Sequence, residues 1–309
     1  MSKVVQISIL AKIAGNVNAD EVIGTRITLK KMYSSTGEVL PLVSARAIKF
    51  AIRHALKEKG FEVDPFYVHP EEALRLADSA KPHIYVDNDL FGYMRTIGGE
   101  RSLKRQAPIG ISYLKALKDT PVKAEFAARF PRPWGEEESP APFEVEVAEF
   151  IGRVNCIMYD YIGNFRQDRK IAESIGEKIK EAKLFLQEVP EELPQDERKK
   201  RIKAFTEIFL TPTYVLPRRT NSLNIPEYIS SIIVLSERGP LPIYQYMNFD
   251  FNSNNVDTKS LEIMMKREEI KKSAAKVFLV DYFDNIQSIP EGIEKVSVSE
   301  AIEKVVNFL

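Results

Sequence analysis

Residues 143–163, FEVEVAEFIGRVNCIMYDYIG, restrict the possible folds of this chain more than any other segment. β-Branched and aromatic residues recur along the segment with a glycine in its middle, which predicts a long strand at the centre of a sheet. A second strand is predicted at residues 4–13, where apolar residues alternate with others and would share one face of the sheet. These apolar residues are Ile7, Ile9, Ala11 and Ile13.

Residues 43–60, VSARAIKFAIRHALKEKG, predict an amphipathic helix. Ser44 is a suitable N-cap, and Gly60 is a typical C-terminal stop. Four apolar residues recur at helical spacing and must face a core, namely Ile48, Ile52, Ala55 and Leu56. Further helices are predicted at about 167–188, at 195–210 and at 297–309, and a further strand is predicted at 276–283.

The order of these elements, without an internal repeat, predicts an α+β fold in which a sheet carries helices on one face and long insertions. Residues 61–106 look inserted. The main domain would then consist of residues 1–60 and 107–309, and residues 61–106 would form a separate subdomain. Such a sheet is the scaffold of RNA-recognition modules among many others, so the fold alone does not give a function.

Length and composition narrow the class of protein. A chain of 309 residues with 44% hydrophobic composition can bury a full core without covalent staples. The single cysteine, Cys156, excludes an intramolecular disulfide. No apolar stretch approaches the roughly 20 residues that span a bilayer, so we expect a soluble, cytoplasmic protein without a membrane partner.

Charge is balanced in total but uneven along the chain. The sequence has 44 Lys and Arg against 44 Asp and Glu. Residues 1–60 carry ten cations and four anions, residues 90–134 carry nine cations and three anions, and residues 135–150 carry six glutamates without a cation. Such segregation indicates a site for a polyanion together with self-association, although ordinary scatter would give the same counts.

Two basic clusters are candidates for the polyanion site. In the helix at 43–60, four cations form a narrow stripe beside the apolar face, and a stripe without acidic neighbours indicates an anionic partner, with a plain solvated face as the open alternative. The stripe consists of Arg46, Lys49, Arg53 and Lys57. The second cluster surrounds Gly98 and Gly99, where glycines let the backbone approach a ligand and cations favour phosphate, with a surface loop as the alternative. Its cations are Arg95, Arg101, Lys104 and Arg105.

Motifs of catalysis are largely missing. The three histidines lack zinc-type spacing, and there is no phosphate loop, dinucleotide fingerprint or nucleophile elbow, so we expect neither a cofactor nor a metal. The triplet Asp87, Asn88 and Asp89 could hold a divalent ion, but a turn is the better interpretation. Asp20, next to Glu21 in a predicted loop, could assist attack by an RNA 2′-hydroxyl, although a carboxylate without a paired histidine is weak evidence.

The sequence resembles a known family. VSARAIKFAIR resembles the Ser-x-x-x-x-Lys-x-x-x-Arg helix start of the backbone subunit of CRISPR Cascade complexes. GNVNADEVIGTRITLKKMYSSTGEVLPLVSARAIKFAIR, DNDLFGYM and RQAPIGISYLKAL are similar to its DevR-type autoregulator branch. The similarity covers most of the first 165 residues and continues more loosely through LPRRTNSLNIP and the terminal strand. It implies an RNA-recognition-module-like (ferredoxin-like) palm with large insertions that form fingers and a thumb, and residues 211–228 would be a thumb-like loop.

The resemblance also implies a function and partners. Such subunits are non-enzymatic scaffolds of type I surveillance complexes, and copies assemble head to tail along a CRISPR RNA. The implied partners are CRISPR RNA, other copies of the chain, other Cascade subunits, and target DNA through the assembled complex. Ser44, Lys49 and Arg53 match the guide-contacting helix of the family. The full predicted RNA-binding set is Arg26, Lys30, Lys31, Ser44, Arg46, Lys49, Arg53, Arg101, Lys104, Arg105, Arg218 and Arg219.

Two alternatives stay open. Related backbone subunits of another CRISPR class cut target RNA with an aspartate after the first strand, where Asp20 lies here. The autoregulator name suggests a protein that binds its own operator DNA, but there is no helix-turn-helix signature. For assembly, the glutamates of residues 136–149 could meet a basic patch on the next copy, which would propagate an open helix.

Overall fold

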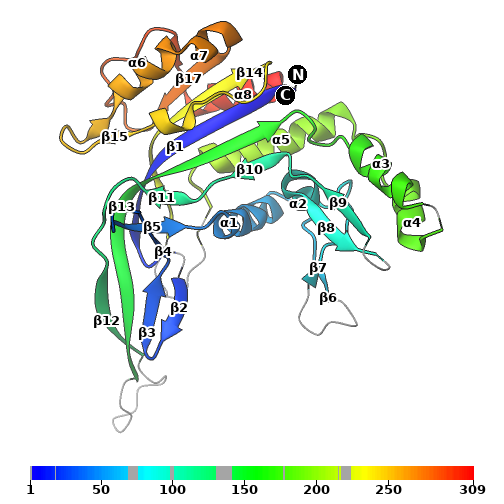
Figure 1. Cartoon of the computed structure of the whole chain (residues 1–309), viewed down its shortest axis with the longest axis horizontal. Helices are drawn as coiled ribbons and strands as arrows, with labels where there is room; N and C mark the ends of the chain where they lie inside the picture. The colour runs from blue at the N-terminus through cyan, green and yellow to red at the C-terminus, as the bar shows by residue number, and fades with distance from the viewer. Residues whose placement is uncertain are drawn as a thin grey trace.

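The computed structural model describes residues 2–17, 19–68, 76–97, 101–129, 141–176, 178–214, 216 and 224–309. A large mixed sheet dominates the α+β fold (Figure 1). Its main strand order is β18-β17-β14-β1-β13-β11-β5-β4. The predicted long strand is confirmed as β13 (Ala141–Tyr159), which runs antiparallel to β1 (Val4–Gly15) and also pairs with β10, β11, β12 and β3.

The remaining elements have the following bounds. The strands of the first part are β2 (Ala19–Ile23), β3 (Arg26–Leu29), β4 (Lys31–Tyr33), β5 (Val39–Val43), β6 (Tyr67–Val68), β7 (Leu76–Ala77), β8 (Tyr93–Thr96), β9 (Ser102–Arg105), β10 (Ile109–Ile111), β11 (Leu114–Ala116) and β12 (Lys123–Arg129). The later strands are β14 (Glu227–Ser236), β15 (Phe249–Asp250), β16 (Asn255–Val256), β17 (Lys276–Asp281) and β18 (Ile293–Lys295). The helices are α1 (Ala45–Glu58), α2 (Val86–Phe91), α3 (Arg166–Ile175), α4 (Lys180–Glu188), α5 (Gln195–Leu210), the 3-10 turn η1 (Tyr244–Tyr246), α6 (Thr258–Lys266), α7 (Glu268–Ser273) and α8 (Val298–Phe308).

The main core lies between the sheet and helices α1, α5 and α8. The alternation predicted for the first strand is confirmed, because its alternate apolar residues all belong to this core. They are Ile7, Ile9, Ala11 and Ile13. On the opposite side, Leu10 and Ile232 of the sheet pack with Leu261 of α6 and Ile270 of α7 in a second core. The prediction of helices on one face only was therefore wrong, since apolar residues of both strand faces need cover.

The helix expected at 43–60 is confirmed as α1. The Ser44 hydroxyl accepts a hydrogen bond from the Ala47 amide at 3.2 Å, which caps the first turn. Gly60 follows the last turn with a φ of +87°, a backbone conformation that glycine adopts without strain. By contrast, the helix expected at about 167–188 is two helices, because Gly176, with a φ of +94°, ends α3 before α4 begins.

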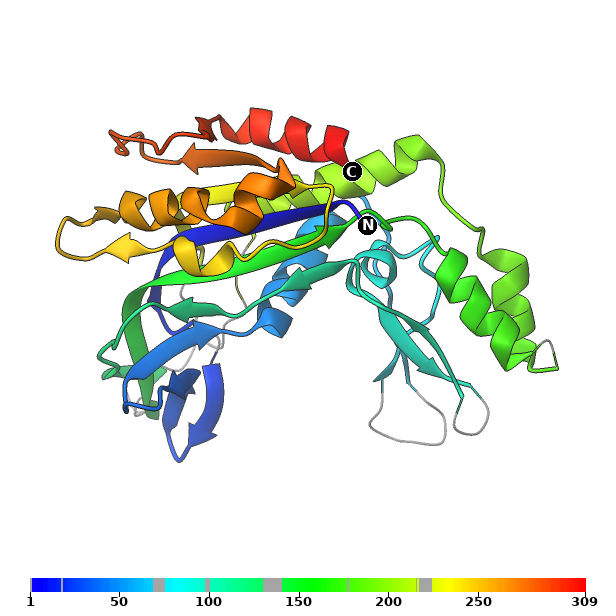
Figure 2. The ribbon, with the colours of Figure 1, turned by 45° about the horizontal axis from the view of Figure 1, so that its top comes forward.

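Two groups of elements project from the sheet in the same direction (Figures 1 and 2). One contains β2, β3, β12 and an end of β13, and the other contains β6 to β9 from the region predicted to be inserted. The second group shares a small core with α3 and α4, in which Tyr93 and Leu103 meet Phe165, Ala172 and Phe185. Helix α1 lies between the two projections (Figures 1 and 2).

The capping box of α8 gives a testable contribution to stability. The Ser297 hydroxyl accepts from the Glu300 amide at 3.2 Å, and the Glu300 carboxylate accepts from the Ser297 amide at 2.7 Å. Ser297→Ala should lower the free energy of unfolding by about 1 kcal/mol in urea titrations, whereas Ser299→Ala in the same exposed turn should have little effect.

The same cap should respond to acid. The hydrogen bond from the Ser297 amide holds the pKa of Glu300 below its ordinary value. An acid whose pKa is lowered by folding contributes stability above its unfolded pKa and loses it as the pH falls. The difference in the free energy of unfolding between wild type and Glu300→Gln, which removes this carboxylate, should therefore narrow as the pH falls through the glutamate range, and a constant difference would contradict the capping box.

Candidate nucleic-acid interface

The basic stripe of α1 is built around one aromatic ring. The Lys49 ammonium lies 5.3 Å from the centroid of the Phe91 ring, and the Arg53 guanidinium carbon lies 5.2 Å from it. Phe91 ends α2, so this short helix supports the side chains of α1. Arg46 and Lys57 are exposed on the same stripe, while Lys49 and Arg53 are half-buried.

The cations of the stripe differ in their partners. Arg53 Nε pairs with Oδ2 of Asp87 at 2.9 Å, and the Asp87 side chain is only 1% exposed. Lys49 and Arg46 pair with no carboxylate in the part of the chain that the structure describes. Burial lowers the pKa of Lys49, and the neighbouring Arg53 charge lowers it further. A half-buried ammonium beside a like charge would gain from an anion. Within the described residues, Arg46, Lys49 and the exposed Lys57 are the cations of the stripe that remain available.

The predicted contacts before α1 are engaged within the chain. Arg26 pairs with Glu144 at 2.6 Å. Lys30 pairs with Asp20, and Lys31 pairs with Glu146, both at 2.8 Å. Burial would raise the pKa of Glu146, but the Lys31 ammonium and the Leu29 amide outweigh burial and hold that pKa below its ordinary value.

These pairs change the interpretation of the acidic segment. Glu144, Glu146 and Glu149 all pair with cations of neighbouring strands, and Glu149 meets Lys12 at 3.3 Å. Glu136–Glu138 lie outside the described residues. The segregation of charge along the sequence is thus neutralised in three dimensions at the described glutamates, which weakens the idea that they meet a basic patch on another copy.

The cluster at residues 95–105 splits into exposed and buried cations. Arg101 is exposed and donates to the Ile175 carbonyl at 3.1 Å, and Lys104 is exposed. The Arg105 side chain is only 2% exposed and pairs with Asp89 and Asp168, each at 2.7 Å. Arg105 therefore has a structural role and is not part of an accessible surface, contrary to the prediction. Gly98 and Gly99 lie outside the described residues.

The acidic triplet is also structural. Asp87, Asn88 and Asp89 lie in α2, are all buried and accept hydrogen bonds from the protein itself, so the prediction of a turn was wrong. Among the residues that the structure describes, no group of three His, Cys, Asp or Glu side chains could hold a metal ion. Asp20 lies in β2 and not in a loop, and its carboxylate is engaged by Lys30.

Arg218 and Arg219 lie outside the described residues, as do residues 215 and 217–223 of the predicted thumb-like loop. One functional feature was missed by sequence reasoning. Arg201 of α5 is buried and donates to Asp89 at 2.9 Å, which ties α5 to α2. A charged residue on the apolar face of the predicted helix, directly before Ile202, was the signal that could have revealed it.

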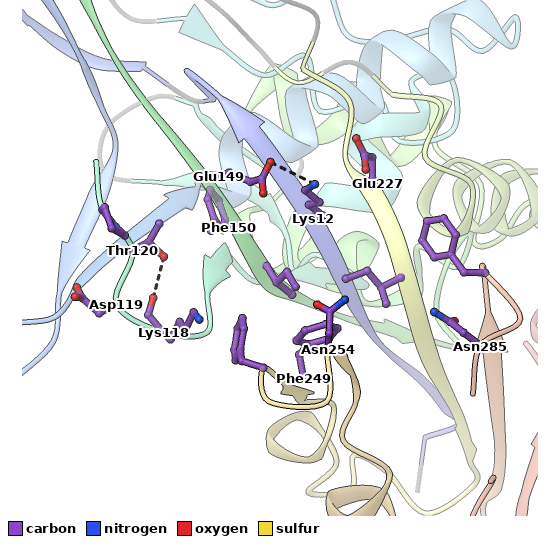
Figure 3. A pocket seen from close by; sticks show the side chains of 15 residues that line it. Lys12, Lys118, Asp119, Thr120, Glu149, Phe150, Glu227, Phe249, Asn254 and Asn285 are labelled. Atoms are coloured by element: carbon purple, nitrogen blue, oxygen red, sulfur yellow. Dashed lines mark hydrogen bonds and ion pairs between the residues drawn. The ribbon is translucent and has the colours of Figure 1, made fainter. Parts of the chain in front are cut away.

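A hollow of about 460 Å³ lies on the other side of the molecule, against β15 (Figure 3). The apolar part of its wall is formed by Phe249, Phe251 and Phe283. Its charged lining comprises Lys12, Lys118, Asp119, Glu149 and Glu227. Figure 3 shows Lys12 paired with Glu149, so two carboxylates, those of Asp119 and Glu227, remain beside one ammonium. That ammonium, of Lys118, lies 3.8 Å from the centroid of the Phe251 ring. This excess of carboxylates makes the hollow a poor site for phosphate.

No helix in the described ranges is both long enough and apolar enough to cross a lipid bilayer.

Comparison with known proteins places the chain in a family. Residues 81–259 match the model of the family described as CRISPR-associated negative auto-regulator DevR/Csa2. No curated protein matches the sequence. A solved chain of a CRISPR RNA-guided surveillance complex is similar at a TM-score of 0.59 and 11% identity, with 98% of both chains covered. A chain of a pre-nicking CRISPR RNA-guided surveillance complex is similar at a TM-score of 0.59 and 12% identity, with 98% of this chain and 100% of the other covered.

The two solved chains show a shared fold over the full length, and the family match begins after α1, whose sequence carried the first resemblance. Because the matched residues make up more than half of the sequence, the chain belongs to the DevR/Csa2 family of CRISPR-associated proteins.

Proposed function

We propose that this chain is a non-enzymatic, guide-RNA-binding backbone subunit of a type I CRISPR Cascade surveillance complex. Family membership and full-length similarity to chains of solved surveillance complexes support the proposal. The observation that carries it is the pair Arg46 and Lys49 on α1. Both residues belong to α1, which lies between the two projections (Figures 1 and 2), and within the described chain neither has a carboxylate partner.

The proposed grip binds the sugar-phosphate backbone. Ser44, Arg46 and Lys49 begin the contact, and Arg53 adds its charge from behind while Asp87 orients it. Phosphate contacts position a strand without reading its sequence, which suits a subunit that must accept any guide. The exposed Arg101 and Lys104 are secondary contacts from the other projection. Arg26, Lys30 and Lys31 would have to exchange their present carboxylate partners for phosphates, and Arg218 and Arg219 remain predictions for the thumb-like loop.

The finer description of the fold is part of the same proposal. In our interpretation the palm is a ferredoxin-like, RNA-recognition-module-like sheet, the projections correspond to the fingers and thumb, and residues 61–106 form the inserted subdomain. The strand order β14-β1-β13-β11, with α1 between β1 and β11 and α5 between β13 and β14, supports the palm assignment.

Assembly follows from the same reasoning. Copies would bind side by side along one CRISPR RNA, other Cascade subunits would cap the array, and target DNA would pair with the exposed guide. A head-to-tail contact that does not close into a ring produces an open helix, whose length the RNA would limit.

Binding of single-stranded RNA and of duplex DNA by the purified chain tests the proposal. We expect affinity for RNA of unrelated sequences to be similar, and size-exclusion chromatography should show larger species only when RNA is present. The family description includes negative auto-regulation, so duplexes from the protein's own upstream region belong in the same assay. Tight, sequence-specific binding to that duplex without RNA would replace our proposal with a regulatory function. Metal-dependent cleavage of complementary RNA that Asp20→Ala abolishes would favour the nuclease alternative.

A further inference from the structure

We infer that the sheet carries a second phosphate-binding site, on the face opposite α1, formed by Lys115, Arg153 and Asn155. Leu114 and Ala116 of β11, and Val154 and Cys156 of β13, belong to the core under α1. Because strand side chains alternate between faces, Lys115, Arg153 and Asn155 point to the other side. There they line a hollow of about 220 Å³, together with Met32, Ser112, Tyr113 and Leu117.

The two cations of the hollow are direct neighbours. Lys115 and Arg153 are opposite each other in the antiparallel pair of β11 and β13. Like charges in such a cross-strand pair destabilise the sheet. None of the residues that line the hollow is acidic, and neither cation has a carboxylate partner in the described ranges. The pair therefore favours an anion from outside the chain.

Arg153 is prepared for such an anion. Its Nη1 atom donates to the Met247 carbonyl at 3.0 Å and to Oδ1 of Asn248 at 2.8 Å, which fixes the guanidinium. Its Nε and Nη2 atoms have no hydrogen-bond acceptor within the described structure. Burial lowers the pKa of Arg153, yet an arginine keeps its proton in proteins, so a half-buried positive charge remains to be compensated.

The neutral groups of the hollow also suit an oxyanion. The side-chain Oδ1 atom of Asn155 accepts from the Ser8 hydroxyl at 2.7 Å, which leaves the side-chain Nδ2 atom of Asn155, within the described residues, as a donor without a partner. Tyr113 at the rim is 48% exposed and offers a face on which a base can stack. A hollow larger than a phosphate group beside an exposed aromatic ring fits a phosphate of single-stranded nucleic acid better than a free phosphate ion.

This site goes beyond the proposed function, because the same subunit would contact one strand at α1 and another strand, or another segment, across the sheet. Its geometry also differs from that of the larger hollow against β15, where carboxylates outnumber cations (Figure 3).

Salt-dependent binding of a labelled single-stranded oligonucleotide tests the inference. In wild type, and in a background that carries Arg46→Gln and Lys49→Gln, we expect Lys115→Gln with Arg153→Gln to flatten the slope of log affinity against log salt by about 1.4, at about 0.7 per lost contact. Lys266→Gln with Lys271→Gln removes the same charge from exposed positions of α6 and α7 and should leave the slope unchanged. The two backgrounds distinguish a wrong proposal for α1 from a wrong inference for this hollow, because each pair of substitutions changes the slope independently of the other.

The single variant Lys115→Gln controls for a folding defect, because it leaves the hydrogen bonds of Arg153 to residues 247 and 248 in place. It should flatten the slope by about 0.7 and, by relieving the like-charge pair, leave the Tm unchanged or higher. An unchanged slope in a folded variant would overturn the inference. Thermal stabilisation by inorganic phosphate at constant ionic strength, without a change in oligonucleotide binding, would also overturn it. A variant that loses self-association but keeps oligonucleotide binding would overturn it as well, because the occupant of the hollow would then be an acidic side chain of another copy.

Discussion

Asp89→Asn should lower the free energy of unfolding by about 3–5 kcal/mol, the largest effect we expect from a single substitution. The Asp89 carboxylate is completely buried. Its Oδ1 atom accepts from Arg105 at 2.7 Å and from the Gly163 amide at 3.0 Å, and its Oδ2 atom accepts from Arg201 at 2.9 Å. Asparagine keeps the shape but removes the charge, so two buried guanidinium groups lose their common counter-ion.

The neighbouring bonds cannot compensate for this loss. Arg105 retains Asp168 at 2.7 Å, but Asp168 also accepts from the Tyr93 hydroxyl. Arg201 keeps its hydrogen bonds to the backbone carbonyls of Pro82 and His83. It also keeps its ion pair with Glu197, whose carboxylate is partly exposed. The network connects α2, β9, α3 and α5, so loosening it should also displace Phe91, the ring under Lys49 and Arg53. We therefore expect weaker RNA binding as a secondary effect.

Urea unfolding followed by circular dichroism measures the change. Glu268→Gln is a matched control, because it removes an exposed carboxylate that pairs with Lys272 at 3.3 Å on the same helix. It should cost no more than about 0.5 kcal/mol. If Asp89→Asn cost as little as the control, the two arginines would have to be solvated in solution, and the network would not be the rigid support described here.

Local patterns in the sequence predicted the main secondary structure well. The face of β1, the length of β13 and both ends of α1 follow from alternation, helical spacing and capping, which depend on residues close in the chain. The interruption between α3 and α4 was missed although Gly176 is visible in the sequence, because one glycine lowers helix propensity by only about 1 kcal/mol and packing decides the outcome.

Contacts between distant segments could not be predicted in the same way. Arg26 and Glu144 are separated by 118 residues, and they meet because β3 runs parallel to β13 in a register that no local pattern encodes. The same limit applies to Arg105 and Asp168. The sequence alone therefore cannot show whether the cations of a basic cluster are free to bind a ligand or are paired with carboxylates from distant segments, because that depends on the topology. For the candidate site, this difference separates Arg46 and Lys49 from most of the other predicted cations.

Arg46→Gln combined with Lys49→Gln should weaken binding of single-stranded RNA by about 25-fold at about 0.1 M salt, with a slope of log affinity against log salt that is flatter by about 1.4. Each phosphate contact contributes about 0.7 to the slope of log affinity against log salt, because binding at that phosphate releases counterions from the RNA. Arg53 is left intact in this variant on purpose. Removing it would strand the buried Asp87 carboxylate, and a loss of binding would then be mixed with a loss of stability.

Fluorescence anisotropy over a salt series gives both quantities, and Lys199→Gln with Lys200→Gln on the exposed side of α5 removes the same charge as a control. The flattened slope has to be specific to α1, because a general effect of net charge would appear equally in the control. Neutralising Lys49 also removes a half-buried charge whose pKa is lowered by its surroundings, so the variant should be at least as stable as wild type. A variant that is stable but binds RNA with an unchanged slope would show that the stripe of α1 faces another protein, and the grip would then have to lie on the second projection at Arg101 and Lys104.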